Sequence, residues 1–91
     1  MALKKDIKQD NGIVLTYHRI VGIENIINDK TILQVHSYLD KEQREKERNK
    51  VDGDIYIVTN YEIMDYNDTL TAHNAYDYLK TLEKYEDAED I

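Results

Sequence analysis

The chain has 91 residues, which allows one modest hydrophobic core, because small domains bury a smaller share of their surface than large ones. It contains no cysteine, which excludes disulfides, thiolate nucleophiles and cysteine-ligated metal centres. The formal net charge of -7 is uneven, with +2 on residues 1–50 and -9 on residues 51–91. An acidic half lacks the clustered cations that bind a phosphate backbone, so we expect no nucleic-acid partner.

Nothing in the sequence indicates export or membrane insertion. The opening Met-Ala-Leu-Lys-Lys-Asp lacks the apolar stretch of a secretory signal, and no segment approaches the ~18 consecutive apolar residues of a membrane-spanning helix. We therefore expect no membrane partner, and we expect the protein in a cytoplasm or in a particle assembled there.

The first predicted elements are two strands of a hairpin. Apolar residues alternate with other residues at Ile13, Leu15, Tyr17, Val21 and Ile23, which is the period of a half-buried strand. Arg19 and Ile20 interrupt the alternation, and Gly22 lies close by, which predicts a bulge or bend. Residues 28–30 are typical of a turn, and a second strand is predicted from Thr31 to about Leu39.

Two further segments precede the helix. Residues 40–54 are predicted to form a charged loop or a frayed helical turn, because Asp40 to Lys50 includes no apolar side chain. A third strand is predicted from Ile55 to Met64. Both of its faces carry apolar residues, so we expect it to be the central strand or to face a second subunit.

A helix is predicted from about residue 72 to residue 83. Thr71 fits its N-cap, and an apolar stripe with helical spacing comprises Ala75, Tyr78, Leu79 and Leu82. Residues 84–91 are too acidic for a core and are unfavourable at the negative end of a helix dipole. We interpret them as a tail that only a partner would order.

These elements predict an α+β fold, with a small antiparallel sheet made of a long bent hairpin and a third strand, and one C-terminal helix packed on it. Residues 1–91 are expected to form a single domain with an ordered core over about residues 12–82. Three strands and one helix leave a sheet edge and part of a face uncovered, which favours self-association.

The three histidines are the only groups that normally titrate near neutrality. With a turn at residues 28–30, His36 is predicted opposite a position near Gly22, and His18 opposite one near Asp40. A contact of His18 with Asp40 at the strand end stays open as an alternative. We interpret His18, His36 and His73 as surface polar residues and assign no catalytic residue.

The acidic residues do not define a metal site either. Asp52 and Asp54, with Glu62 and Asp65, do not match the EF-hand pattern, and we interpret Asp52-Gly53-Asp54 as a polar turn. Asp65, Asp68 and Asp77 lack the spacing of a carboxylate pair for acid–base catalysis. We expect no metal and no cofactor.

Eight tyrosines, with no Phe and no Trp, are the compositional oddity of the chain. Tyrosine combines a large apolar ring with a hydroxyl that tolerates water, which suits half-buried sheet faces and protein interfaces. Two interpretations stand side by side: packing in the core and on the sheet face, or a contact surface around Tyr56, Tyr61 and Tyr66.

Several segments together resemble a family of small proteins encoded by phages and prophages of Gram-positive bacteria, whose genes lie in the tail or late structural region. The segments are Met1 to Ile7, Asn11 to Ile20, Lys41 to Glu45, and Ala75 to Leu82 with the ending Ala88 to Ile91. The resemblance implies a structural or assembly role, in the cytoplasm of a bacterial host or in the virion, without assigning residues to it.

We therefore expect a non-enzymatic phage or prophage structural or tail-assembly protein that contacts itself, as a homo-oligomer, and other phage proteins. The alternative is an acidic adaptor or regulatory module that binds a basic host or phage protein through its C-terminal half. A small enzyme or metal-binding domain is the third and least supported hypothesis.

Overall fold

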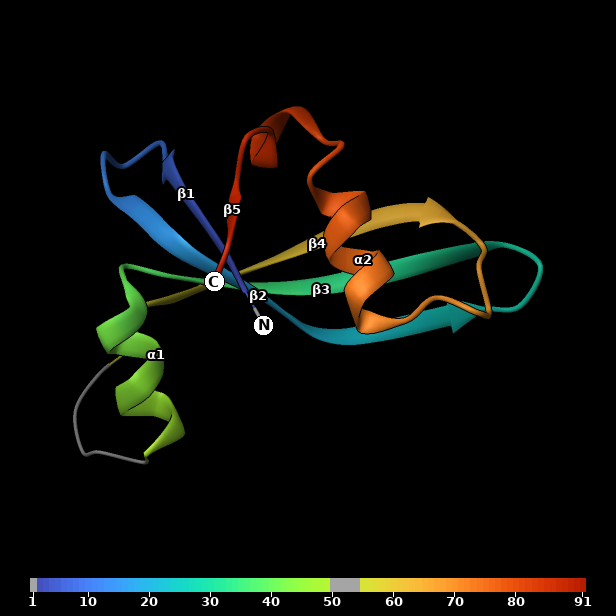
Figure 1. Ribbon diagram of the computed structural model, residues 1–91, viewed down its shortest axis with the longest axis horizontal. Coiled ribbons are helices and arrows are strands. Elements are labelled where there is room, and N and C mark those ends of the chain that lie inside the picture. Colours follow the sequence, from blue (N-terminus) through green and yellow to red (C-terminus); the bar gives the residue numbers. More distant parts are fainter. Residues whose placement is uncertain (1, 50–54) are drawn as a thin grey trace.

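The computed structural model describes residues 2–49 and 55–91, which fold into an antiparallel five-stranded sheet with two helices and a 3₁₀ turn (Figure 1). The strand order across the sheet is β4-β3-β2-β1-β5. The elements in chain order are β1 (Leu3–Lys8), β2 (Val14–Ile26), β3 (Lys30–Tyr38), α1 (Lys41–Arg48), β4 (Ile57–Asp65), α2 (Ala72–Leu79), η1 (Glu83–Tyr85) and β5 (Glu89–Asp90). The predicted α+β class is confirmed, but the sheet has two strands more than predicted.

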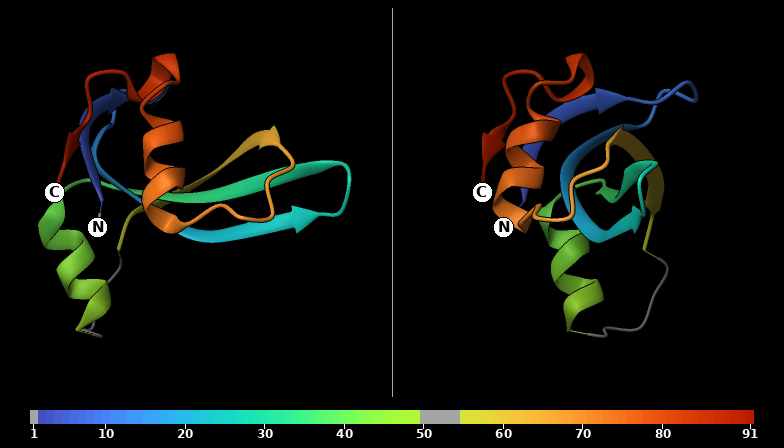
Figure 2. Two further views of the ribbon diagram at one scale, coloured as in Figure 1. Left: turned by 45° about the vertical axis from the view of Figure 1, so that its right-hand side comes forward. Right: turned by 90° about the vertical axis from the view of Figure 1, so that its right-hand side faces the viewer.

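The predicted hairpin is confirmed as β2 and β3. Its turn falls at residues 27–29, where Asn28 adopts a left-handed backbone with φ of 58°, a conformation that asparagine tolerates. The register shifts between Ile20 and Gly22, so the bulge predicted from the broken alternation is present. Beyond the bulge, the distal part of the hairpin extends with β4 past α2 as a long arm (Figure 2).

The prediction for the two ends of the chain was wrong. Strand β1 lies before residue 12, and residues 84–91 are no tail, because β5 pairs with β1 through Leu3 with Asp90 and Lys4 with Glu89. Tyr85 is fully buried in this segment, and Lys80 binds the carboxylate of Asp90 at 2.9 Å. Pairing with β1 and burial of Tyr85 order the acidic segment within the chain itself.

The prediction of a loop over residues 40–54 was wrong for its first part. Residues 41–48 form α1, with the Asp40 side chain accepting from the Gln43 amide as N-cap. Instead of an apolar stripe, polar contacts hold α1 to the sheet: Glu47 accepts from Tyr38 of β3 at 2.8 Å and lies 3.8 Å from the guanidinium of Arg19 in β2. The remainder, including the predicted Asp52-Gly53-Asp54 turn, lies outside the described residues.

Helix α2 begins as predicted, with the Thr71 hydroxyl accepting from the Asn74 amide. It ends at Leu79, four residues earlier than predicted, and the chain then turns into η1. The helix buries Ala75, Tyr76 and Leu79 against Leu33 and Val35 of β3. The core therefore lies between α2 and one face of the sheet.

The third predicted strand is β4, and its predicted central place was wrong. β4 lies at the edge of the sheet, paired only with β3 among the described residues, whereas β2 is the middle strand of the five. Apolar residues on both faces of a strand indicate a central position in the sheet only where other elements cover both faces. One face of β4 is uncovered.

Candidate protein-contact surface

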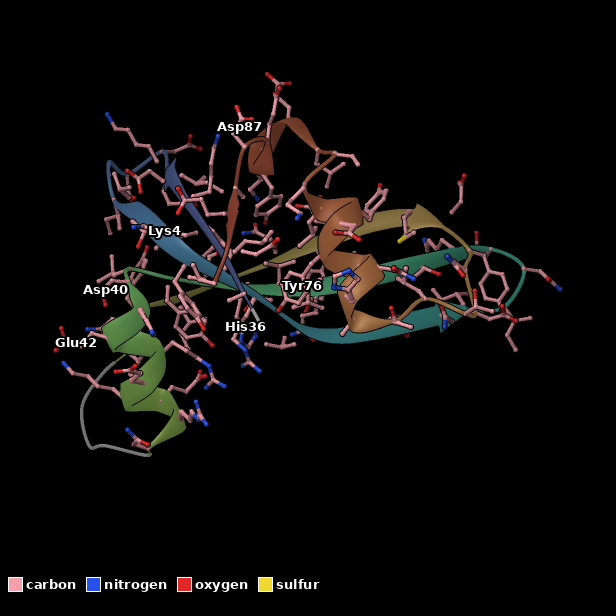
Figure 3. All side chains as sticks on the ribbon, in the orientation of Figure 1. Lys4, His36, Asp40, Glu42, Tyr76 and Asp87 are labelled. Carbon is pink, nitrogen blue, oxygen red and sulfur yellow. The ribbon has the colours of Figure 1, made fainter. Side chains whose placement is uncertain are left out.

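The two faces of the sheet differ in what covers them. Along β3, Leu33 and Val35 are buried beneath α2, while Ile32, Gln34 and His36 alternate with them on the other side and are only half-buried. Figure 3 shows His36 leaving β3 on the side away from α2, which carries the labelled Tyr76. This second side is here called the open face.

Helix α1 covers one end of the open face. Tyr38, which follows His36 on that side of β3, is fully buried, and its hydroxyl donates to Glu47 of α1. Arg19, paired with His36 in the neighbouring strand, lies 3.8 Å from the same carboxylate. The open face is therefore bare only toward the distal arm.

On the bare part of the open face, β4 presents the most exposed large apolar side chains of the described sheet strands. Tyr61 is 62% exposed and Ile63 is 60% exposed. They pair with Gln34 and Ile32 of β3. A shallow hollow of about 130 Å³ lies beside Tyr61, lined by Gly22, Ile23, Glu24, Ile32, Gln34 and Tyr61. Two large apolar side chains exposed side by side on a sheet face mark it as a candidate surface for another protein.

The outer edge of β4 adds unpaired backbone groups to this patch. β4 is nine residues long, pairs with β3 without a register shift, and contains neither lysine nor proline. Natural edge strands are commonly protected by short length, lysine, proline or a bulge, and β4 has none of these. The Tyr78 hydroxyl reaches the Ile63 carbonyl at 3.5 Å and is the one side-chain donor recorded on the described backbone of β4.

The three tyrosines of the predicted contact surface do not meet in one chain. Tyr61 lies in the middle of β4, whereas Tyr56 precedes the strand and Tyr66 follows it, about 30 Å apart at the usual rise of a strand. Tyr56 is 37% exposed and its hydroxyl accepts from Asn11. Tyr66 is half-buried.

Both interpretations of the tyrosines apply, to different residues. Tyr38, Tyr76 and Tyr85 are buried and belong to the packing of the sheet faces. Tyr61 belongs to the open face. Nothing in the sequence indicated Ile63, its similarly exposed neighbour, as a contact residue. Its exposure depends on the edge position of β4 and on the uncovered face, and no local sequence pattern indicates either.

The prediction that all three histidines lie at the surface was wrong for His18, which is 1% exposed. It pairs with Ser37, not with a position near Asp40, and His36 pairs with Arg19 rather than near Gly22. The earlier turn and the bulge shift the register from the predicted one. The three histidines do not come together, and His73 is an exposed residue of α2.

The surroundings of His18 fix its tautomer. Nε2 lies 2.7 Å from the Lys5 carbonyl, which can only accept, so Nε2 carries the proton and Nδ1 accepts from the Ser37 hydroxyl at 2.7 Å. Burial lowers the pKa of His18, because the charged ring would lose its hydration. The neutral ring joins β1, β2 and β3, and its partners show a structural role.

The carbonyl that His18 binds is freed by a bulge in β1. Lys4 pairs with Tyr17 and Ile7 with Leu15, so Lys5 and Asp6 together oppose one residue of β2. The Lys5 ammonium in turn binds the Glu86 carbonyl, and the Tyr85 ring packs edge-on against His18 with centroids 5.6 Å apart. His18 therefore lies beneath the C-terminal segment that bears β5.

The acidic residues named from the sequence do not form a metal centre within residues 2–49 and 55–91, where no group of three or more potential ligands lies together. Glu62 lies 3.7 Å from the Lys84 ammonium, and Asp77 lies near Lys80 and His73. Asp65 and Asp68 are exposed. Asp52 and Asp54 lie outside the described residues.

In the part of the chain that the structure describes, no helix is long and apolar enough to cross a membrane. Comparison with known proteins found no matching family model, no matching curated protein and no matching solved structure. The surface itself, with Tyr61 and Ile63 exposed on a long edge strand, is therefore the basis for a functional assignment.

Proposed function

We propose that this chain is a non-enzymatic protein-contact module of the structural or assembly kind, and that it acts through the open face and the outer edge of β4. The observation that carries the proposal is the exposure of Tyr61 and Ile63 on a long edge strand that has no lysine, proline or bulge. The resemblance to phage and prophage proteins supports a virion or tail-assembly setting, in which such a module contacts itself and other phage proteins.

The size of the chain supports self-contact. A domain of 91 residues has a small core, and a second copy that covers Tyr61 and Ile63 would add buried apolar surface that the fold alone does not supply. We therefore propose a homo-oligomer in the cytoplasm of a bacterial host or in its virion.

The test is the solution mass by light scattering over a dilution series, for the wild type, Ile63→Glu and Ile27→Glu. Ile27 is the matched control, because it is 76% exposed in the turn between β2 and β3, away from the edge of β4. We expect the wild type and Ile27→Glu to form oligomers and Ile63→Glu to be monomeric. Equal masses for Ile63→Glu and the wild type would contradict a role of this surface.

The virion setting has a separate test. Mass spectrometry of purified phage particles from a host that encodes this chain should detect it in near-stoichiometric amounts with another tail component. Its absence from the particles would contradict the virion role and leave the assembly role.

The acidic adaptor is the second candidate, favoured by the ordered carboxylates of the C-terminal segment. Glu83, Glu86 and Asp87 are exposed on a segment fixed by buried Tyr85, so a basic protein would meet a preformed acidic surface. Because a deletion of residues 83–91 would remove Tyr85, the test neutralises the three side chains to Gln or Asn. Partner binding that survives both neutralisation and raised salt would contradict the adaptor.

A further inference from the structure

We propose that two copies of this chain join through the outer edges of β4, antiparallel and centred on Tyr61, so that the two five-stranded sheets become one continuous sheet. This inference rests on the proposed contact function and names its partner, a second copy, and the pairing of the two strands. It follows from which backbone groups of β4 point outward and from the order of side chains along the strand.

The contact from Tyr78 identifies the outward-pointing residues. In an antiparallel strand, alternate residues direct both N–H and C=O to the same side. The Tyr78 hydroxyl reaches the Ile63 carbonyl from outside the β3–β4 ladder, so Ile63 points outward. The odd-numbered positions 57, 59, 61, 63 and 65 then offer their backbone groups to another strand, while the even-numbered ones face β3.

Only one symmetric pairing uses the whole edge. Two antiparallel copies related by a two-fold axis place one residue opposite itself, at the centre of either a hydrogen-bonded or a non-hydrogen-bonded pair. Centring on Tyr61 pairs all nine residues of β4, whereas centring on Asn60 or Glu62 pairs seven and centring on Thr59 or Ile63 pairs five. Centring on Glu62 would also place two carboxylates opposite each other, which is unfavourable.

The side chains are compatible with the Tyr61-centred pairing. Thr59 lies opposite Ile63 of the second copy on the open face, and Asn60 lies opposite Glu62 of the second copy on the other face. No charged residue of β4 lies opposite a like charge. The two Tyr61 rings become neighbours at the axis, and the exposed Ile63 and Tyr61 patches of both copies merge into one apolar strip.

The same symmetry accounts for the spacing of the three tyrosines. Tyr56 and Tyr66 each lie five residues from Tyr61. The pairing therefore brings Tyr56 of one copy beside Tyr66 of the second copy at each end of the shared edge. Three residues that are spread along one chain form three tyrosine pairs across two chains, which is the reason to prefer a second copy over a foreign strand.

Charge predicts how this association responds to salt. Each copy has a formal net charge of -7, so two copies repel each other, and salt screens that repulsion. Self-association should therefore tighten as salt rises, whereas binding of a basic partner to the acidic surface should weaken. Light scattering of the wild type at low and at high salt separates the two.

The register is tested by cross-linking, for which the cysteine-free chain is well suited. Tyr61→Cys should form a disulfide-linked dimer under mild oxidation, because residues directly opposite each other lie within the Cα distance of ~4.4–6.8 Å that a disulfide spans. Thr59→Cys alone and Ile63→Cys alone should not, since each lies opposite the other position. A mixture of these two variants should form the heterodimeric disulfide.

Circular dichroism should show that each cysteine variant is folded, because these side chains are exposed. Tyr78→Phe is a further test variant, at a residue outside the paired strands. Removing the Tyr78 hydroxyl frees the Ile63 carbonyl, so the dimer should form at equal or lower protein concentration. A large rise in the concentration needed would contradict the outward direction of the odd-numbered residues.

The outcomes separate this inference from the proposed function. Oligomers that depend on Ile63 but give no Tyr61→Cys disulfide would overturn the edge pairing and leave the contact surface in place. Efficient cross-linking of Thr59→Cys alone would overturn the register. A wild type that is monomeric at every concentration and salt would overturn the pairing of two copies. The contact surface would then be tested by binding of a foreign partner: loss of that binding in Ile63→Glu would support the surface, and unchanged binding would contradict it.

Discussion

The two edges of the sheet are built on different principles. The β5 edge is two residues long, carries only the carboxylates of Glu89 and Asp90, and is fixed through Tyr85 and the Lys80 to Asp90 ion pair. The β4 edge is nine residues long and carries Tyr61 and Ile63 in the open. The difference teaches that the chain completes one edge by its own residues and leaves the other available for association.

The largest expected effect comes from breaking the completed edge. Tyr85→Ala removes a fully buried ring and should lower the free energy of unfolding by about 3–5 kcal/mol, as for other buried aromatic residues. Chemical denaturation at a protein concentration too low for association measures it. Tyr61→Ala is the matched control on the open edge and should change stability by less than about 1 kcal/mol.

Acid should weaken the completed edge next. Because the pKa of His18 is lowered in the folded chain, a fall in pH below 6.5 protonates His18 in the unfolded chain while the folded chain keeps it neutral. Stability is therefore full above pH 6.5 and declines below it, by up to about 1.4 kcal/mol per pH unit until the folded pKa is reached. Denaturation at several pH values measures this slope.

The contribution of His18 is isolated by substitution. His18→Gln should flatten the dependence of stability on pH between neutrality and mild acid, whatever its effect on stability at neutral pH. His73→Gln, at an exposed position of α2, should keep the wild-type slope. Identical slopes in both variants would show that the buried ring is not the titrating group.

A smaller and opposite effect is expected from Tyr85→Phe. The Tyr85 hydroxyl is buried and has no hydrogen-bond partner among the described residues, and burial raises its pKa, with a smaller effect from the charge of Glu62. Removing a buried hydroxyl without a partner should stabilise the fold by about 1 kcal/mol. Thermal and chemical denaturation measure the change, and a clear loss of stability would reveal a partner such as a buried water.

The smallest effect on stability should come from protecting the open edge. Tyr61→Lys places a cation where the proposed pairing puts it opposite itself, so association should be lost. The free energy of unfolding of the monomer should change by no more than about 0.5 kcal/mol, since Tyr61 is 62% exposed. Light scattering measures the association, and Ile27→Lys in the turn is the control that should still associate.

The parts of the fold that the sequence predicted have local signals. The alternation broken at Ile20 predicted the bulge, and Thr71 three residues before Asn74 predicted the helix start. Helix α1 was missed because contacts from the sheet hold it, although Asp40 followed three residues later by Gln43 is a recognisable capping signal. β5 was missed because a two-residue strand is defined by its distant partner in β1.

The candidate surface was predictable to a smaller extent. Composition indicated Tyr61 as a contact residue, and the structure places it on the open face. Strand order decided the exposure of the rest: it placed β4 at the edge and left Ile63 exposed. Strand order depends on pairings between residues far apart in the chain, and no residue pattern within β4 encodes it.

The junction of the chain ends has a consequence for folding. Ala2 and Ile91 exchange backbone hydrogen bonds of 3.0 and 2.9 Å, so this pairing closes a loop of nearly the whole chain. The hairpin of β2 and β3, by contrast, closes over a three-residue turn. Because long loops cost more entropy to close and pairings distant in sequence form slowly, we expect the hairpin to form early and the β1–β5 pairing to form last. During synthesis, β1 therefore stays without its outer partner until β5 has emerged.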